Sequence, residues 1–206
     1  MFDPLHTPYN KRTLTASELE ERIVACGDPI HVHRVINAYE MARSVHAGQI
    51  RNDGTALFDH IARTARIIMD ELHLHDTDLI TSALLHDVLE DSAQITREVL
   101  EYNFGSYVAY VVETLTKDLQ KAKVDPENID LQYVARLKKS SHDCILIKLA
   151  ARLDNVRCIS FNLKRNPLVY LAHTLERYLP MAESSTNPRL HALASMIRAE
   201  ANTVLG

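Results

Sequence analysis

The sequence predicts an all-α fold. Only five glycines and seven prolines interrupt its 206 residues, so long segments remain between the positions where helices usually stop. Strict alternation of apolar and polar residues, the pattern of a half-buried strand, does not extend over any useful length of the sequence. Helices joined by loops are therefore expected throughout.

The first elements are predicted from their starting signals. Ser17 and Glu20 have the spacing of a capping box, which opens a short helix. The pair Asp28-Pro29 then begins a longer helix, because proline suits the first helical turn. Residues 48–59 contain two glycines and an Asn-Asp-Gly turn signal, so an irregular loop is expected there. Loops of this kind often carry function.

The remaining helices are separated by short connections. Segments such as LHLHDTD, NFGS and KAKVDPEN favour packing between helices that are neighbours in sequence. A chain of this length can bury one full core, so we expect residues 1–206 to form a single domain. The predicted helices span about residues 17–26, 28–47, 59–72, 77–91, 96–103, 106–117, 129–141, 144–160, 167–180 and 187–204.

The composition favours work on a small molecule. The net charge is −4 and basic residues are scattered, so binding to nucleic acid is not expected. No apolar stretch approaches the roughly 20 residues of a membrane span, and the N-terminal sequence MFDPLHTPYNKRTL does not resemble a signal peptide. Cys26, Cys144 and Cys158 lack the spacing of a disulfide framework or zinc site. We expect a cytoplasmic protein, and the sequence leaves its oligomeric state open.

The segment LLHDVLED places ionisable groups within an apolar helix. At 100° per residue, His86, Asp87, Glu90 and Asp91 share one face of the predicted helix 77–91, and the opposite face is apolar too. Ionisable groups in such a setting are costly unless they are paired or hold a metal. Adjacent His and Asp side chains offer nitrogen and oxygen ligands suited to Mn²⁺, Fe²⁺ or Zn²⁺. The two later acids would lie within reach of a metal-activated water.

A plainer interpretation is that residues 86–91 form the solvated end of a core helix. Two ligands do not complete a metal site, so others must come from elsewhere in the chain. His60 is the best candidate, because it begins a helix directly after the loop at 48–59 and can point into a cleft. A single histidine is nevertheless more often a capped or core residue than a ligand.

Several motifs occur in order along the chain, namely His60, His86-Asp87, Glu90-Asp91 and KLAARLDN at 148–155. Together they resemble the HD-domain hydrolases of the RelA/SpoT type, and most closely the small alarmone hydrolases, which lack a synthetase. The stretch HAGQIRNDGTALFDH resembles the family's arginine-containing loop before a metal-binding histidine. FGSYVAYVVETLTKD resembles the segment after its His-Asp helix. The match spans roughly residues 40–160.

The resemblance implies an all-α HD-domain bundle that hydrolyses the 3′-pyrophosphate of (p)ppGpp or (p)ppApp, usually with Mn²⁺. By this resemblance the metal ligands would be His60, His86 and Asp87, and the residues that handle the attacking water would be Glu90 and Asp91. The substrate-binding residues would be Arg51, Asn52, Asn155 and Arg157. Lys117, Lys121 and Arg136 are further cations that could hold a polyanion, although each is more often a surface charge.

The metal motif has one departure from the family. The third residue after Lys148 is normally an aspartate that completes the metal site, and here it is Ala151. Three interpretations compete: a substitution made to inactivate an active enzyme, a natural binder that has lost catalysis, or a rearranged site in which Asp154 takes over. Asp154 lies about 60° away around a helix, which makes its reach to the same ion doubtful. We favour the inactivated enzyme.

The arginine-containing loop, which the resemblance implies would bind the base, also departs from the family pattern. It reads Arg51-Asn52-Asp53-Gly54 where the family commonly has Arg-Lys-Ser-Gly. Asn52 and Asp53 bring acceptors that suit the exocyclic amine of adenine as well as that of guanine, so the base stays open. Two other functions also stay open: a nucleotide-binding regulator with a crippled metal site, and a different HD phosphohydrolase acting on nucleoside mono- or triphosphates.

Overall fold

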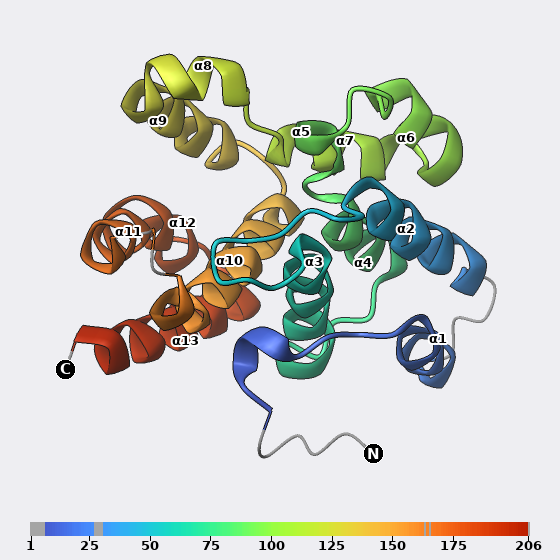
Figure 1. Ribbon diagram of the computed structural model, residues 1–206, viewed down its shortest axis with the longest axis horizontal. Coiled ribbons are helices and arrows are strands. Elements are labelled where there is room, and N and C mark those ends of the chain that lie inside the picture. The colour runs from blue at the N-terminus through green and yellow to red at the C-terminus, as the bar shows by residue number, and fades with distance from the viewer. Residues whose placement is uncertain (1–6, 27–30, 163, 165, 206) are drawn as a thin grey trace.

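A computed structural model describes residues 7–26, 31–162, 164 and 166–205. Within these ranges the chain forms helices and one isolated antiparallel bridge, between Ile50 and Ala56, but no strand (Figure 1). The all-α prediction is therefore confirmed. The elements are η1 (Tyr9–Lys11), α1 (Ala16–Ala25), α2 (Val32–Val45), α3 (Leu57–Arg66), η2 (Ile67–Glu71), α4 (Thr77–Leu85), α5 (Val88–Asp91), α6 (Arg97–Phe104), α7 (Ser106–Leu115), α8 (Leu119–Val124), α9 (Pro126–Leu137), α10 (His142–Arg157), η3 (Ile159–Phe161), α11 (Pro167–His173), η4 (Thr174–Tyr178), α12 (Leu179–Glu183) and α13 (Pro188–Leu205).

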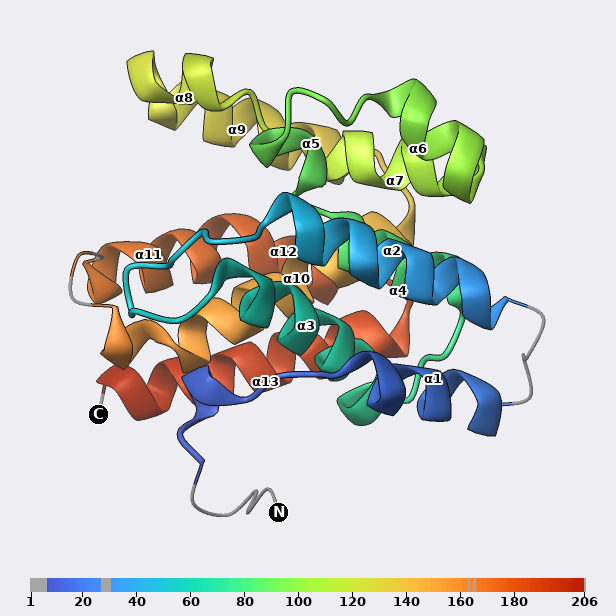
Figure 2. The same ribbon diagram turned by 45° about the vertical axis from the view of Figure 1, so that its right-hand side comes forward.

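Helix α10 runs through the middle of the molecule. It packs against α3 on one side and α13 on another, while α2 packs against α4 and α6 pairs with α7 (Figure 1). Helices α5 to α9 lie across one end of the molecule in both ribbon views (Figure 2). This arrangement brings segments that are distant in sequence to the centre of α10.

Helix α1 begins earlier than predicted. The capping box is formed by Thr15 and Glu18: Thr15 Oγ1 accepts from the Glu18 amide at 3.2 Å, and the Thr15 amide donates to Glu18 Oε2 at 2.8 Å. The proposed box of Ser17 and Glu20 is therefore wrong. Leu14 before the cap and Leu19 after it are both buried in one core cluster, as in a hydrophobic staple, and this contact selects the earlier start.

The loop at 48–59 is irregular over most of its length, as expected, and α3 begins at Leu57. The predicted helix start at Asp28-Pro29 lies outside the described residues, and α2 is helical from Val32. The connection KAKVDPEN was expected to be a loop, and this is wrong. Asp118 caps α8, and Asp125 followed by Pro126 starts α9, so both helices carry ordinary start signals.

The predicted helix 77–91 is broken at the His-Asp motif. Helix α4 ends at Leu85, and Asp87, with φ −109° and ψ −1°, is the N-cap of the one-turn helix α5. The His86 imidazole Nδ1 donates to the carbonyl of Ala83 at 2.8 Å. In a continuous helix that carbonyl accepts from the amide of residue 87, so the imidazole competes with the helix at the point where the chain turns.

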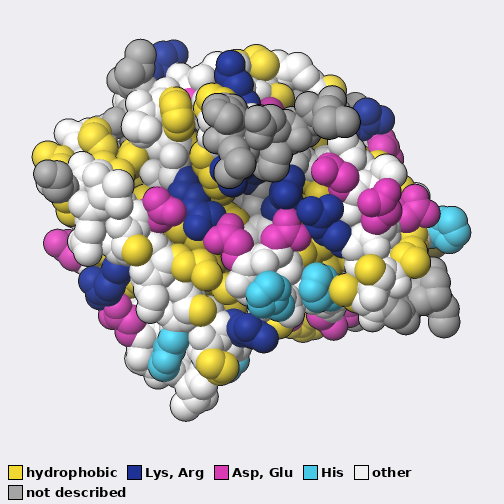
Figure 3. Space-filling view, turned by 90° about the horizontal axis from the view of Figure 1, so that it is seen from below, with side chains coloured by type: hydrophobic (Ala, Val, Ile, Leu, Met, Phe, Trp, Pro, Cys, Tyr) yellow, Lys and Arg dark blue, Asp and Glu magenta, His cyan; other side chains and the backbone are white. Residues whose placement is uncertain are grey.

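The surface carries charges of both signs. Arg22 and Arg66 both pair with Asp70, and the face in Figure 3 shows basic and acidic side chains next to one another. Among the described residues, no helix is long and apolar enough to cross a membrane.

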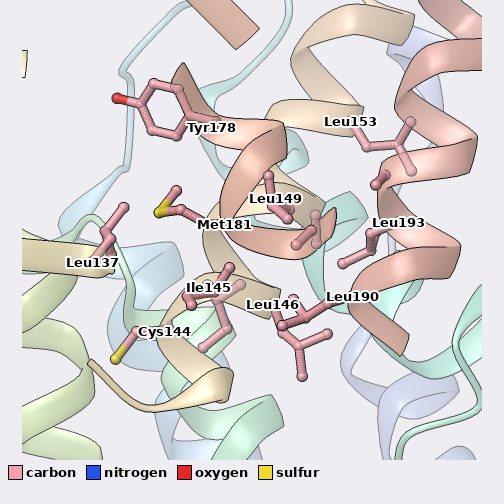
Figure 4. Close-up of a cluster of buried hydrophobic side chains, with 14 of the residues drawn as sticks. Leu137, Cys144, Ile145, Leu146, Leu149, Leu153, Tyr178, Met181, Leu190 and Leu193 are labelled. Carbon is pink, nitrogen blue, oxygen red and sulfur yellow. The ribbon is translucent and has the colours of Figure 1, made fainter. Parts of the chain in front are cut away.

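Two of the three core clusters of the described residues meet at α4. Leu79 and Ala83 belong to one cluster, and Ile80 and Leu84 belong to the other, so α4 is apolar on two sides and buried, as predicted. In the first cluster, leucines of α10 face α12 and α13 (Figure 4). Because each buried leucine or isoleucine contributes roughly 1.5–3 kcal/mol, these contacts hold α10 firmly in place.

Leu193 in α13 tests this packing, because it is fully buried against the first cluster. We expect Leu193→Ala to lower the free energy of unfolding by about 2–5 kcal/mol, through lost burial and a residual cavity. Leu131→Ala is the matched control, since Leu131 is 51% exposed, and it should change stability by no more than about 0.5 kcal/mol. Urea denaturation followed by circular dichroism measures both, and equal effects would contradict the packing described.

Candidate metal centre and active-site cavity

Three side chains that are distant in sequence converge beside α10. One ligand atom from each of His60, His86 and Asp87 lies within 4.8 Å of the others. His60 comes from α3, His86 ends α4 and Asp87 starts α5. The two imidazole rings are 5.6 Å apart, centre to centre. The convergence expected from sequence is present, and these residues could hold a metal ion.

The orientation of His60 is set by Asp154. Nδ1 of His60 lies 2.6 Å from Asp154 Oδ2, so it donates to that carboxylate, and the lone pair of the neutral ring is on Nε2. Burial lowers the pKa of His60 to about 4, against the opposing effect of Asp154. The ring is therefore neutral at pH 7, which is the form that binds metal.

His86 is oriented by the backbone. Its Nδ1 is bonded to the Ala83 carbonyl, and its Nε2 lies 3.3 Å from Asp87 Oδ2. Burial disfavours a charge on His86, but the Asp87 carboxylate outweighs it and raises the pKa of the imidazole. Burial likewise works against ionisation of Asp87, yet His86 and other cations hold its pKa well below the usual range. Both imidazoles thus have Nε2 free of backbone contacts, and the site attracts positive charge.

Asp154 is a buried charge centre as well as a partner of His60. Arg63 donates from Nε to Asp154 Oδ1 at 2.6 Å, and Arg51 donates to Oδ2 at 3.3 Å. Although burial opposes ionisation, hydrogen bonds from His60 and Arg63 hold the pKa of Asp154 well below the usual range. Asp154 lies behind His60 and is not part of the group of possible ligands, so the structure does not place it in the position that Ala151 leaves open.

A cavity of about 220 Å³ adjoins the possible ligands. Besides His60, His86 and Asp87, it is lined by Glu90, Lys117, Lys148, Ala151, Arg152, Asn155 and Tyr170. Ala151 presents its methyl group at this surface and is only 3% exposed. The residue that departs from the family pattern therefore lies at the wall of the cavity itself.

Glu90 and Asp91 point to different places. Glu90 lines the cavity, and its Oε1 accepts from the Lys117 amide at 2.6 Å. Burial, followed by the charge of Asp87, raises the pKa of Glu90, so this carboxylate accepts a proton more readily than an ordinary glutamate does. Asp91 instead lies 3.4 Å from Nδ1 of His46, on the side of α2, and does not line the cavity. Successive residues of a helical turn face different directions, and this separates the pair.

Of the predicted substrate-binding residues, some lie at the cavity and others do not. Asn155 lines the cavity and its Oδ1 accepts from Arg51 at 2.6 Å, so these two residues are joined. Asn52 is exposed at the tip of a tight turn closed by Gly54, whose φ is +81°. The side chain of Asp53 bonds Thr55 rather than facing the cavity.

Arg157 is not brought to the site. It pairs with Glu71 at 2.6 Å and with Glu200 at 2.8 Å, and its guanidinium lies over the ring of Tyr9. Two carboxylates already neutralise its charge, so it is a poor candidate for phosphate binding. Lys121 and Arg136 line a separate cavity beside α8 and α9, and Lys117 borders both cavities.

Sequence reasoning missed three of the cavity residues, namely Lys148, Arg152 and Tyr170. Two of them could have been found. Lys148, Ala151, Arg152 and Asn155 have spacings of three, four and seven residues, which place them on one face of a helix. Tyr170 comes from α11 and carries no comparable signal in the sequence.

The fold agrees with comparisons to known proteins. A family model described as "HD domain" matches residues 38–185, so the chain belongs to the HD-domain family. Helices α2 to α12 lie wholly or mostly within the matched region, as do all of the cavity residues.

Similar proteins include a guanosine-3′,5′-bis(diphosphate) 3′-pyrophosphohydrolase of Vibrio cholerae, 36% identical over 70% of this chain and 21% of its own length. One of that name from Aquifex aeolicus is 34% identical over 75% of this chain and 22% of its own length. A GTP pyrophosphokinase rsh of Brucella suis is 32% identical over 80% of this chain and 22% of its own length. The chain thus spans about a fifth of the length of these relatives.

A solved structure is also similar. It is described as "A metazoan ortholog of SpoT hydrolyzes ppGpp and plays a role in starvation responses", and it matches with a TM-score of 0.69 and 26% identity. The match covers 81% of this chain and 94% of the other.

Substitution of Asp154 tests whether its buried charge stabilises the helices that form the site. We expect Asp154→Asn to lower the free energy of unfolding by about 3 kcal/mol, because Arg63 is left as a buried cation without its counter-ion. Asp70→Asn is the matched control, since Asp70 also contacts two arginines but is 34% exposed, and its cost should stay below about 1 kcal/mol. Urea denaturation at pH 7 measures the two values.

The effect of Asp154→Asn should also depend on pH. A carboxylate whose pKa is depressed in the folded state stabilises fully above its unfolded-state pKa of about 3.9, and loses that contribution as the pH falls further. The stability difference between the two proteins should therefore be steady above about pH 5 and shrink below about pH 4. A stability difference between the two proteins that stays unchanged below about pH 4 would contradict this account.

Proposed function

We propose that this chain is a metal-dependent alarmone hydrolase that removes the 3′-pyrophosphate of (p)ppGpp or (p)ppApp. The observation that carries the proposal is the convergence of His60, His86 and Asp87 beside a cavity lined by Glu90 and cations. An HD-domain match and the names of the relatives support the same reaction. Since the chain spans about a fifth of those relatives, their activity is carried over here as a proposal.

His60, His86 and Asp87 would hold the metal, for which we propose Mn²⁺. Two neutral nitrogen donors and one carboxylate suit Mn²⁺, Fe²⁺ or Zn²⁺, and Asp154 behind His60 fixes the imidazole as a ligand requires. Such an ion, when bound, activates water and neutralises negative charge at the phosphate under attack.

Glu90 would take a proton from the attacking water. Its Oε1 is bonded to the Lys117 amide, so the carboxylate is held in place while Oε2 remains for the proton. The water oxygen bonds to the phosphorus nearest the ribose as its proton passes to Glu90, the bond from that phosphorus to O3′ breaks, and O3′ takes a proton from solvent water. Inorganic pyrophosphate leaves. Asp91, through its contact with His46, would position α5 for this step.

The nucleoside would lie toward Arg51 and Asn155. The two side chains are hydrogen-bonded to each other, and the exposed turn at Asn52 is next to them in sequence. Donors and acceptors are both present at this end, so guanine and adenine are retained as alternative bases. A cytoplasmic location is part of the same proposal, because a nucleotide substrate of this kind is a small soluble molecule.

Ala151 is proposed to impair the reaction. A methyl group offers no oxygen, so a metal held by three side chains lacks one ligand and one negative charge. The alternative function, a nucleotide-binding regulator without turnover, is favoured by this residue alone. A different HD phosphohydrolase acting on nucleoside mono- or triphosphates would share the metal residues, and Glu90 and Asn155 at the cavity favour the alarmone hydrolase over it.

Restoring the missing acid tests the proposed function. Ala151→Asp should raise Mn²⁺ affinity by at least about tenfold, which is the effect expected of a missing ligand or supporting group, and should produce pyrophosphate from ppGpp or ppApp. Ala151→Asn is the matched control, since it adds a neutral oxygen of similar size. Equilibrium dialysis measures the metal, and anion chromatography measures the products. Metal binding without turnover in Ala151→Asp would favour the regulator.

The role of Glu90 is tested in the restored protein. Glu90→Gln combined with Ala151→Asp should lower kcat by about 10²–10⁴-fold, the range for losing a general base, and leave Mn²⁺ affinity within about threefold. Glu98→Gln, on the exposed first turn of α6, is the control and should alter neither quantity. If Glu90→Gln also removes the metal, then Glu90 is a ligand rather than a base.

A further inference from the structure

The segment of residues 7–14, called the N-terminal strap below, lies against α3. It includes η1 and leads into α1, and in both ribbon views its dark-blue trace runs beside α3 (Figures 1 and 2). The HD-domain model matches residues 38–185, so the strap is outside the region that the family model describes. The role of the strap must therefore be inferred from its own contacts.

The end of the strap nearest α1 is anchored independently of the metal centre. Arg66 donates from Nη1 to the carbonyl of Thr13 at 2.8 Å, and the hydroxyl of Tyr39 donates to the carbonyl of Leu14 at 2.8 Å. The side chain of Leu14 is fully buried in the core. Helices α2 and α3 thus hold this end of the strap through its backbone as well as through a core side chain.

Arg63 connects the other end of the strap to the metal centre. Its Nη1 donates to the carbonyls of Asn10 at 2.7 Å and Arg12 at 3.1 Å. Its Nε donates to Asp154 Oδ1 at 2.6 Å, and its Nη2 donates to Asp154 Oδ2 at 3.3 Å and to Cys158 Sγ at 3.7 Å. A guanidinium has five N–H donors in a rigid fork, and these contacts use all of them. Arg63 therefore cannot move relative to Asp154 without losing bonds to the strap.

The ring of Tyr9 holds η1 against three guanidinium groups. Its centre lies 5.7 Å from Cζ of Arg63, 5.4 Å from that of Arg12 and 5.3 Å from that of Arg157. Cation–π contacts of this kind are attractive, most of all where water is excluded. The ring therefore fixes the part of the strap whose carbonyls bind Arg63.

The contacts of Arg63 extend to the imidazole of His60. Asp154 accepts from Arg63 Nε with one carboxylate oxygen and from His60 Nδ1 with the other, at 2.6 Å in each case. Both donors come from α3, three residues apart. A carboxylate held at both oxygens cannot rotate away from the imidazole. Partners that orient a histidine ligand from behind typically change metal affinity by about 10–100-fold when they are lost.

We propose that Arg63 and the N-terminal strap position the metal centre. The strap holds Arg63, Arg63 holds the carboxylate of Asp154, and the carboxylate fixes the ring of His60 so that Nε2 is the atom offered to a ligand. A metal on His60 rests on the proposed function, but the fixing of the ring by the strap is a separate claim that can be tested without metal. Arg63 and Tyr9 are thus positioning residues that act through His60.

The first test measures exchange with water of the Nδ1 proton of His60. Nuclear magnetic resonance of the full chain, with ¹⁵N-labelled histidine and a chelator present, detects this proton, and its signal is assigned by its loss in His60→Gln. Tyr9→Ala should speed exchange at least about tenfold, because the strap then holds Arg63 less tightly. Arg63→Lys should have a larger effect, because one ammonium group cannot reach Asp154 and both strap carbonyls at once. Tyr9→Phe keeps the ring and should stay within about threefold of the unmodified chain.

His86 is the internal control for this measurement. Its Nδ1 is bonded to the Ala83 carbonyl, not to the strap, so the ratio of the two exchange rates separates a change at His60 from general loosening. Leu193→Ala loosens the core between α10 and α13 and should leave this ratio unchanged. The proposal would be overturned by an unchanged ratio in both Tyr9→Ala and Arg63→Lys, or by an equal change in Leu193→Ala.

The second test is Mn²⁺ affinity, measured by equilibrium dialysis in the Ala151→Asp protein. Adding Arg63→Lys should weaken Mn²⁺ binding about tenfold or more, adding Tyr9→Ala should weaken it about threefold or more, and adding Tyr9→Phe should leave it unchanged. Thermal unfolding confirms that each variant is folded. Equal Mn²⁺ affinity in all of these proteins would contradict the positioning role. If Ala151→Asp shows no hydrolysis while the ranking of variants holds, the proposed reaction fails but the positioning role is supported.

Discussion

The carboxylate of Asp154 is the interaction on which the rest of the site depends. It lies within the protein with no exposed side-chain surface, and it bonds Arg63, His60 and Arg51 at the same time. A buried charge is tolerated only when it is paired and hydrogen-bonded, so these partners must stay where they are. Through them α10 is tied to α3 and to the loop before it.

This arrangement links the group of possible metal ligands to the loop that carries Arg51. His60 and Arg51 share one oxygen of Asp154, and Arg51 also bonds Asn155, which lines the cavity. A movement of α10 would therefore shift both the imidazole of His60 and the loop that carries Arg51. Arg63 connects the same carboxylate to the N-terminal segment through the carbonyls of Asn10 and Arg12, which anchors that segment against α3.

The break between α4 and α5 is caused locally, by a side-chain hydrogen bond to the backbone, and it changes the directions of Glu90 and Asp91. The His86 imidazole is bonded to the backbone of its own helix, and the chain turns at Asp87. Had the helix continued, Glu90 and Asp91 would have stayed on the face of His86, as the sequence pattern suggested. Instead, Glu90 reaches the Lys117 amide and Asp91 reaches His46. The cavity is lined by residues of α3, α5, α10 and α11 and by residues of the connections between helices.

The sequence by itself determined the helical class, the buried character of α4 and the group His60, His86 and Asp87, because apolar spacing and ligand chemistry are local properties of the chain. By family resemblance it also predicted Arg51 and Asn155 as substrate-binding residues, and the structure joins the two by a hydrogen bond. Only the tertiary structure decided that Arg157 faces Glu71 and Glu200, that Asp154 supports His60, and that Lys148 and Arg152 face the cavity. These ion pairs and hydrogen bonds join residues that lie roughly 40 to 100 positions apart in the sequence. Which residues meet depends on how the helices pack, and the pattern along a single helix does not specify it.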